Sequence, residues 1–507
     1  MQSSNRLDTL EKVSLALAAL ALGVMVGVIA AAPLQGSFTA PLARLYSLLL
    51  PVAGATLLIV VSLYSPLAAL LLWLVLAPYS RLIPLDLSLG AGVPDLSLTR
   101  LMAGAMTLLV LIQAALGKRA LRRLTWADLA YALFLVALFI SVPRSEYDAL
   151  FDVQNILDAY IVPFVALFVA RQIVRDLRDL QWFTVALLIT GVGFALLVIR
   201  EQLTGEVLFF ARETLSYSPS FRKVVSLMGN AAPLGLSIAL TLPLGLVLTS
   251  RALFAPSPDG RKRLAQGLLV VAVGIVALGA YMTYNRASWL AVVIGVVVLA
   301  VLRPRMRRML LPVLVGAALL ALIFWPAVSQ SAAVNERLLE DNSLDYRSTA
   351  LTLALDMVRK DPLVGLGYNN FGPTAKRVYG WDPFQIFGIY PPAHNSYTFL
   401  LVSGGLLALV PYLGWMVLLA WGGAKRYRAF GKRLARAEVE QARDALAAGA
   451  AMLLSYAVAS ATFDNGDHVI MNLIFYMAIG AIWGATEMRS TRIGGCVVEP
   501  LCYIIPP

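Results

Sequence analysis

Charged residues, histidine and cysteine are all scarce in this sequence. Only 14% of its 507 residues are charged while 59% are hydrophobic, and the chain holds two histidines and two cysteines. A soluble globular protein is about a quarter charged and nearer half apolar, so this composition argues against an ordinary soluble domain. The two cysteines, Cys496 and Cys502, have no histidine near them and lack the spacing of a zinc site.

Familiar catalytic motifs are missing too. The chain has no P-loop, no HExxH and no GxSxG, and the glycines of "GLGYNNFG" lack the spacing of a dinucleotide fingerprint. Acidic residues of the predicted outer loops are scattered singly and form no DxD-like pair. The sequence therefore predicts neither a bound catalytic metal nor a cofactor.

Long apolar runs are what the sequence has instead. The stretches 45–80, 228–250 and 309–335 contain no charged residue, and runs of that length can cross a hydrocarbon core about 30 Å thick. The sequence thus predicts an all-α polytopic membrane protein with about 12 to 14 transmembrane helices. The predicted segments lie near 14–32, 45–64, 66–79, 99–116, 127–143, 155–172, 182–199, 231–250, 265–283, 287–302, 309–329, 396–420, 446–463 and 469–486.

Positive charge is grouped in short blocks between these runs, and the net charge is +12. Such blocks are typical of cytoplasmic loops under the positive-inside rule, so we expect no nucleic-acid partner. With both termini in the cytoplasm, all the blocks fall on that side and one large loop, 330–395, falls outside. The blocks are KRALRR (118–123), RQIVRDLR (171–178), RKR (261–263), RPRMRR (303–308) and KRYRAFGKRLAR (425–436).

This topology divides the chain into regions and places the candidate chemistry on the outer face. The predicted regions are N-terminal transmembrane helices (1–220), central transmembrane helices (221–329), an outer loop with amphipathic helices (330–395), C-terminal transmembrane helices (396–486) and a cytoplasmic tail (487–507). In the outer loop, the apolar residues of "DYRSTALTLALDMVRK" fall on one helical face, which predicts an amphipathic helix on the membrane or over a cavity.

Arginines stand at the outer ends of two predicted helices. Arg286 opens the segment 287–302 in "TYNRASWLAVV", where it either anchors the helix at the interface or binds an anion. Arg222 and Lys223 precede "SLMGNAAPLG", in which Asn230 and Pro233 are typical of a helix start. The exposed amides of such a start cap the helix and also suit a phosphate.

A histidine stands at the outer end of a third predicted helix. His394 follows two prolines in "YPPAHNSYTF" and precedes Asn395 and Tyr397. An imidazole of near-neutral pKa can take a proton from a hydroxyl. The alternative is a polar cap at the membrane interface. For the other histidine, His468, a loop or capping role is favoured.

Together these residues resemble the O-antigen ligase/polymerase superfamily of bacterial inner-membrane glycosyltransferases. The similarity covers roughly residues 220–420 and includes "RKVVSLMGNAAPLG", "YNRASWLAVVIG" and "AHNSYTFLLVSGGLLALV". Its most specific part is "YRSTALTLALDMVRKDPLVGLGYNNFG", in which Arg347 is the second residue. Further along the chain this stretch is followed by "HNSY" and a Gly-Gly pair.

The resemblance implies a GT-C-like, metal-independent and inverting enzyme with no cofactor. Such an enzyme moves a glycan from undecaprenyl diphosphate to an acceptor on the periplasmic face of the inner membrane. Its partners are therefore membrane lipid, the lipid-linked donor and a glycan acceptor such as lipid A core oligosaccharide.

The resemblance also implies roles for individual residues. The family's outer arginines correspond to Arg222 and Arg286, which would bind the diphosphate, with Arg347 assisting. The family's histidine corresponds to His394, as general base or acceptor-orienting group. Supporting candidates around them are Lys223, Asn230, Asn395 and Tyr397.

Other functions stay open at this point. A polymerase that uses a second lipid-linked repeat unit and a protein O-oligosaccharyltransferase are alternatives to the ligase. A transporter of a small solute or of a lipid-linked glycan is the alternative of another class. Ion-coupled transporters carry ionisable residues near the bilayer midplane. Here Asp128 and Asp158 are expected near helix ends, which argues against such coupling.

Overall fold

The fold is seen in a computed structural model of the chain. It describes residues 65–82, 97–207, 224, 226–254, 260–329, 342–381, 395–430, 436–466, 468–487, 492–493 and 496–497. Most of this part is helical, and its only strands are the short antiparallel pair β1 (Arg492–Ile493) and β2 (Cys496–Val497). The predicted apolar segments 14–32 and 45–64 lie outside the described residues.

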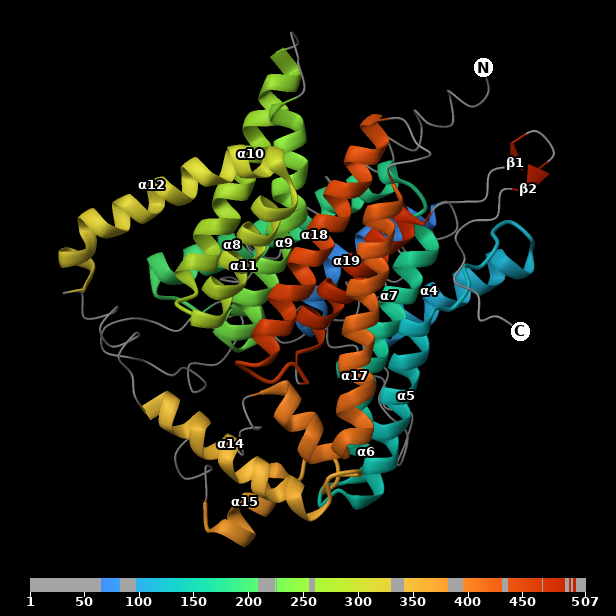
Figure 1. The fold of residues 1–507 in the computed structure, drawn as a ribbon, viewed down its shortest axis with the longest axis vertical. Coiled ribbons are helices and arrows are strands. Elements are labelled where there is room, and N and C mark those ends of the chain that lie inside the picture. Colours follow the sequence, from blue (N-terminus) through green and yellow to red (C-terminus); the bar gives the residue numbers. More distant parts are fainter. Residues whose placement is uncertain are drawn as a thin grey trace, which may run out of the picture.

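The chain runs back and forth through a helical bundle (Figure 1). Its helices and short helical turns are α3 (Pro66–Leu76), η2 (Ala77–Leu82), α4 (Leu98–Ala115), α5 (Trp126–Ser141), η3 (Val142–Arg144), α6 (Ala149–Ile156), η4 (Leu157–Ile161), α7 (Val162–Ile173), α8 (Leu177–Thr204), η6 (Ser226–Met228), α9 (Ala231–Leu253), α10 (Gly260–Met282), α11 (Arg286–Leu302), α12 (Pro304–Ser329), α14 (Asn342–Lys360), α15 (Phe371–Tyr379), α17 (Ser396–Ala429), α18 (Arg436–Ser460) and α19 (Val469–Thr486).

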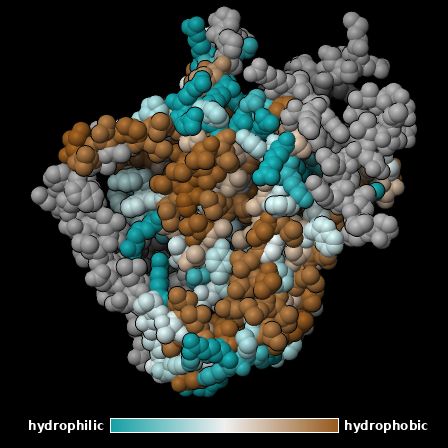
Figure 2. Space-filling model, viewed as in Figure 1, coloured by the Kyte–Doolittle hydropathy of each residue, from teal (hydrophilic) through white to brown (hydrophobic). Residues whose placement is uncertain are grey.

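Eight helices of the described part are long and apolar enough to cross a membrane, and α3 and α11 are shorter apolar helices. Large apolar side chains face outward along them, including Leu133 on α5, Val271 on α10 and Val417 on α17. Figure 2 shows hydrophobic atoms over the middle of the visible face and hydrophilic atoms towards its two ends. An outer surface of this kind suits lipid, so the predicted all-α polytopic membrane fold is confirmed.

One end of the bundle gathers arginines from the basic blocks, and we call it the basic end. Arg171 of α7 forms a buried ion pair with Asp128 of α5 (2.8 Å), and Arg122 pairs with Glu487 after α19 (3.1 Å). Arg303, between α11 and α12, forms an ion pair with Asp444 of α18 (2.5 Å). The sequence blocks that contain these arginines are the ones that the positive-inside rule assigns to the cytoplasm.

Asp158 does not lie at a helix end as the sequence suggested. The helical segment that contains it begins at Ala149, well before the predicted start, and continues through the π-turn η4 into α7. The Asp158 carboxylate accepts two hydrogen bonds from the Arg100 guanidinium, at 2.7 and 2.9 Å. Because the Asp158 carboxylate inside the helical segment is paired bidentately with an arginine, its role fits a structural ion pair and not the ion coupling of a transporter.

The helix α17 is interrupted where the loop that follows α14 packs against it. Gly405 has φ +64° within the helix, a conformation that breaks the helical hydrogen-bond ladder. The amides of Leu366 and Gly367 donate to the carbonyls of Val402 and Ser403 (2.7 and 3.2 Å). The amide of Leu406 donates to the carbonyl of Pro362 (2.9 Å). The loop therefore satisfies backbone groups that the break would leave unpaired.

The same loop is tied to the end of α5. The Tyr368 amide donates to the Ser141 carbonyl (3.2 Å), and Asn370 Nδ2 donates to the carbonyl of Arg144 (2.8 Å). The guanidinium of Arg144 in turn pairs with the Asp361 carboxylate at 2.5 Å. The sequence "DPLVGLGYNN" (361–370) thus joins α5, α14 and α17 at one end of the bundle.

Gly405→Ala is expected to destabilise the protein. A Cβ at this position would lie 2.2 Å from the Leu363 carbonyl oxygen, and its φ is one that side chains rarely adopt. We expect the free energy of unfolding, measured by thermal unfolding of detergent-solubilised protein, to fall by about 1–3 kcal/mol. Gly414→Ala on the same helix is the control, because nothing lies within 4 Å of its added Cβ. Equal melting of both variants would contradict the role of the break.

Acid is expected to loosen the loop. The hydrogen bond from Arg144 holds the pKa of Asp361 below its usual 3.8. A carboxyl group with a lowered folded-state pKa stabilises fully above its unfolded pKa and loses that effect as the pH falls through the folded value. The ratio of the amide hydrogen-exchange rates of residues 363–370 to those of α9 should therefore be constant between about pH 7 and 5 and should rise below about pH 4.

Asp361→Asn serves as the matched variant for this measurement. Its loop should exchange faster than that of the wild type near neutral pH and should show little further change on acidification. A loop in the variant that stays as protected as in the wild type would count against the ion pair.

Candidate functional site

Three helices begin with an asparagine at the end of the bundle opposite the basic end. Asn230 accepts the amide of Ala232 (2.9 Å) at the start of α9, and Asn285 accepts the amide of Ser288 (3.0 Å) at the start of α11. Asn395 accepts the amide of Tyr397 (3.0 Å) at the start of α17. Side-chain oxygens at this position satisfy amides that the helix itself leaves unpaired. We call this region, defined by Asn230, Asn285 and Asn395, the capped end.

Close packing of α9 on α11 fixes the position of Arg286. A Cβ at Gly235 of α9 would lie 2.2 Å from Ser288 Oγ and 2.8 Å from Thr283 Oγ1, so only glycine allows this approach. On the other side, Gln202 of α8 donates to the carbonyl of Met282 (3.0 Å). The half-buried Arg286 side chain therefore begins at a junction of α8, α9 and α11.

Aromatic residues surround this junction. The rings of Tyr281 and Trp289 stack at 5.7 Å, and the ring of Tyr284 lies 6.5 Å from Trp289. Burial raises the pKa of Tyr284, so its phenol stays neutral at physiological pH. Tyrosine and tryptophan at a helix end are typical of a membrane interface, so we expect Arg286 to lie near headgroup depth.

The helix α18 connects the starts of α11 and α17. Ser455 Oγ of α18 donates to the carbonyl of Ala291 (2.8 Å), and Tyr397 Oη donates to the carbonyl of Ala457 (2.7 Å). Ala291 lies little more than one turn beyond Arg286, and Tyr397 is the second residue of α17. Arg286 and Asn395 thus flank the last turns of α18 at the same end of the bundle.

Buried polar residues hold the start of α17 in place, and the sequence analysis missed them. Ser396 Oγ accepts the amide of Asn465 (2.8 Å) and donates to the carbonyl of Phe463 (3.2 Å). Asn472 of α19 donates to the carbonyl of Asn465 (2.9 Å) and accepts from the hydroxyl of Tyr456 (2.8 Å). The only sequence signal was the polar stretch "FDNGDH" between two apolar segments.

The predicted amphipathic helix is present as α14, which packs against α17 and α15 near this end (Figure 1). Ala350, Ala354 and Val358 are buried as expected. Leu351 and Leu355, assigned to the same face, are instead 44% and 48% exposed. The buried face is therefore narrower than the sequence pattern suggested, and two leucines lie beside it on the surface.

The structure brings together part of the predicted site. Asn230, Arg286, Asn395 and Tyr397 lie at the capped end, where the asparagines cap helices and the Tyr397 hydroxyl bonds to backbone. The Arg347 side chain is exposed on α14. His468 stands at the start of α19. Arg222, Lys223 and His394 lie outside the described residues, and the catalytic and diphosphate-binding roles of the whole set stay predictions.

The geometry of the capped end favours an anion. The positive ends of the helix dipoles of α9, α11, α17 and α19 all face this end, and each such end carries about half a positive charge. The guanidinium of Arg286 adds a full charge at the start of α11. Helix N-termini and arginine are both suited to phosphate oxygens.

These features define a polytopic α-helical membrane protein with an anion-favouring end. Residues 269–413, from within α10 to within α17, match the family model described as O-antigen ligase. This match to part of the chain supports its place in the O-antigen ligase/polymerase superfamily. A search of curated proteins finds no match.

Proposed function

We propose that this protein is a glycosyltransferase that moves a glycan from undecaprenyl diphosphate to an acceptor hydroxyl on the periplasmic face of the bacterial inner membrane. The observation that carries the proposal is the position of Arg286: it lies inside the region that matches the O-antigen ligase model and at the capped end. A periplasmic site follows if the basic end faces the cytoplasm, because the capped end is then on the outer side.

The proposed reaction is a single displacement at the anomeric carbon. The acceptor oxygen forms a bond to this carbon while its bond to the diphosphate oxygen breaks, so the configuration inverts. Arg286, Arg222 and Arg347 bind the diphosphate and stabilise the charge that develops on it. His394 takes the proton of the acceptor hydroxyl. Guanidinium groups keep their positive charge at any working pH, so the diphosphate is neutralised without a metal ion.

The acceptor is proposed to be lipid A core oligosaccharide, as in a ligase. The polymerase and the protein O-oligosaccharyltransferase share the same donor chemistry and differ in the molecule that supplies the hydroxyl. Proteoliposomes with one defined lipid-diphosphate glycan and three acceptors distinguish them. Product on core oligosaccharide supports the ligase, whereas product on a second repeat unit or on protein supports one of the other two.

Arg286→Lys is expected to lower glycan transfer by roughly 10- to 100-fold, because a point charge replaces a planar fork with two parallel donors. The measurement is the rate of transfer by purified, reconstituted protein. The control is Arg359→Lys on α14, where the arginine side chain is 82% exposed. If the Arg286 variant keeps the wild-type rate, the residue acts only as an interface anchor.

His394→Ala is expected to reduce transfer by about 10²–10⁴-fold while the melting temperature stays near that of the wild type, because a general base contributes to the rate and not to folding. The matched control is His468→Ala, which removes the other histidine. Full transfer by the folded His394 variant would refute its assignment. A chelator present throughout should leave the wild-type rate unchanged.

A further inference from the structure

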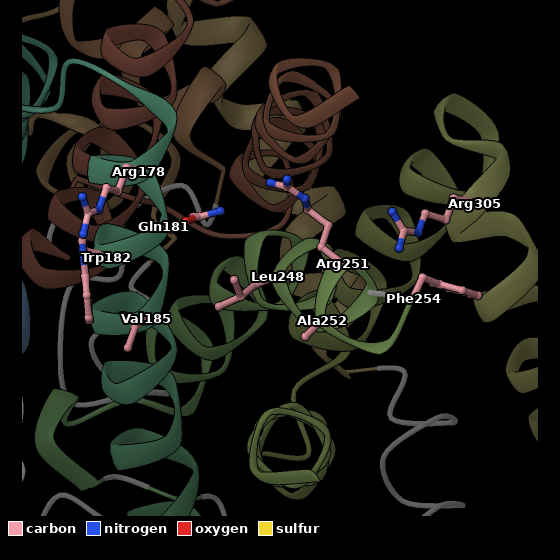
Figure 3. Close-up of a pocket in the computed structure, with 9 residues that line it drawn as sticks. All are labelled: Arg178, Gln181, Trp182, Val185, Leu248, Arg251, Ala252, Phe254 and Arg305. Atoms are coloured by element: carbon pink, nitrogen blue, oxygen red, sulfur yellow. The ribbon is translucent and has the colours of Figure 1, made fainter. Parts of the chain in front are cut away.

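A second cationic site lies at the basic end, far along the helices from the capped end. It is a cavity of about 610 Å³ between the beginning of α8, the end of α9 and the beginning of α12 (Figure 3). In Figure 3, Gln181 and Arg251 reach towards each other from α8 and α9. Its lining comprises three arginines, one glutamine, two aromatic residues and three aliphatic residues: Arg178, Arg251, Arg305, Gln181, Trp182, Phe254, Val185, Leu248 and Ala252.

The lining is strongly cationic. Among the residues that the structure describes, it has three guanidinium groups and no carboxylate. Arg305 is held in place because it donates to the Ser250 carbonyl (3.3 Å) and lies 4.6 Å above the ring of Phe254. Asp444, the acid that acts electrostatically on Arg251, is already paired with Arg303 at 2.5 Å. Arg251 and Arg305 therefore give the described lining a cationic character that suits an anion.

The depth of the cavity indicates what kind of anion fits. Its arginines belong to the first turn of α8, the last turn of α9 and the first turn of α12. Of these helices, α8 and α9 are long and apolar enough to span a membrane. Its apolar residues Val185 and Leu248 lie further along α8 and α9, towards the bundle centre. Charge at the helix ends and apolar surface beyond it match the order of headgroup and acyl chain in a lipid.

We propose that this cavity binds the phosphate of an anionic phospholipid headgroup from the leaflet at the basic end. The planar guanidinium fork pairs with two phosphate oxygens, and Gln181 supplies a neutral donor. Basic pockets between transmembrane helices on the cytoplasmic side typically bind the headgroups of such lipids. A free phosphate ion has the same charged oxygens but cannot use the apolar part of the lining.

The test is thermal unfolding of the full-length protein in neutral detergent with added lipid. Phosphatidylglycerol should raise the melting temperature more than phosphatidylcholine, and inorganic phosphate at the same concentration should raise it less than phosphatidylglycerol. The double variant Arg251→Gln/Arg305→Gln should bind phosphatidylglycerol at least about 10-fold more weakly, since two charge-assisted hydrogen-bonding groups are lost.

The matched control is Arg308→Gln, an exposed arginine of α12 that does not line the cavity. It should leave the effect of phosphatidylglycerol intact. The comparison of lipids on the wild-type protein needs no variant to fold. Equal stabilisation by phosphatidylcholine, equal stabilisation by inorganic phosphate, or an equal loss in Arg308→Gln would each overturn the proposal.

Discussion

Backbone hydrogen bonding between the loop 362–367 and the break in α17 is the constraint on which the capped end depends. In lipid every backbone amide and carbonyl has to be paired within the protein, so a spanning helix can be interrupted only where another segment supplies partners. Here Val402, Ser403 and Leu406 find those partners in the loop after α14. The short first part of α17 can then take its own direction, with Asn395 at its start and Tyr397 bonded to α18.

The two ends of the bundle use positive charge in different ways. At the capped end the charge comes from helix N-termini together with Arg286, and Gly235 brings α9 close enough to α11 to concentrate it. At the basic end arginine side chains supply the charge, and several of them are neutralised by Asp128, Asp444 and Glu487. We propose that the first end handles the diphosphate of a substrate and that the second holds a structural lipid.

The membrane fold and several helix starts could be predicted from sequence, because long uncharged runs and the Asn230–Pro233 pattern are local signals. The break at Gly405 could not, since its partners lie some forty residues earlier and Gly-Gly in an apolar run is compatible with an intact helix. The depth of Asp158 was misjudged because polar residues at the start of α6 hid the true helix start. Polar residues such as Asn465 and Asn472 act through tertiary contacts that sequence spacing does not show.

The central claim is that the lipid-linked donor binds with its diphosphate at the capped end. A cryo-electron microscopy structure of the reconstituted protein with an undecaprenyl-diphosphate glycan tests it most directly. The account predicts diphosphate density within hydrogen-bonding distance of Arg286, near the starts of α9, α11 and α17. Diphosphate density at the basic end instead, with Arg286 facing lipid alone, would contradict it.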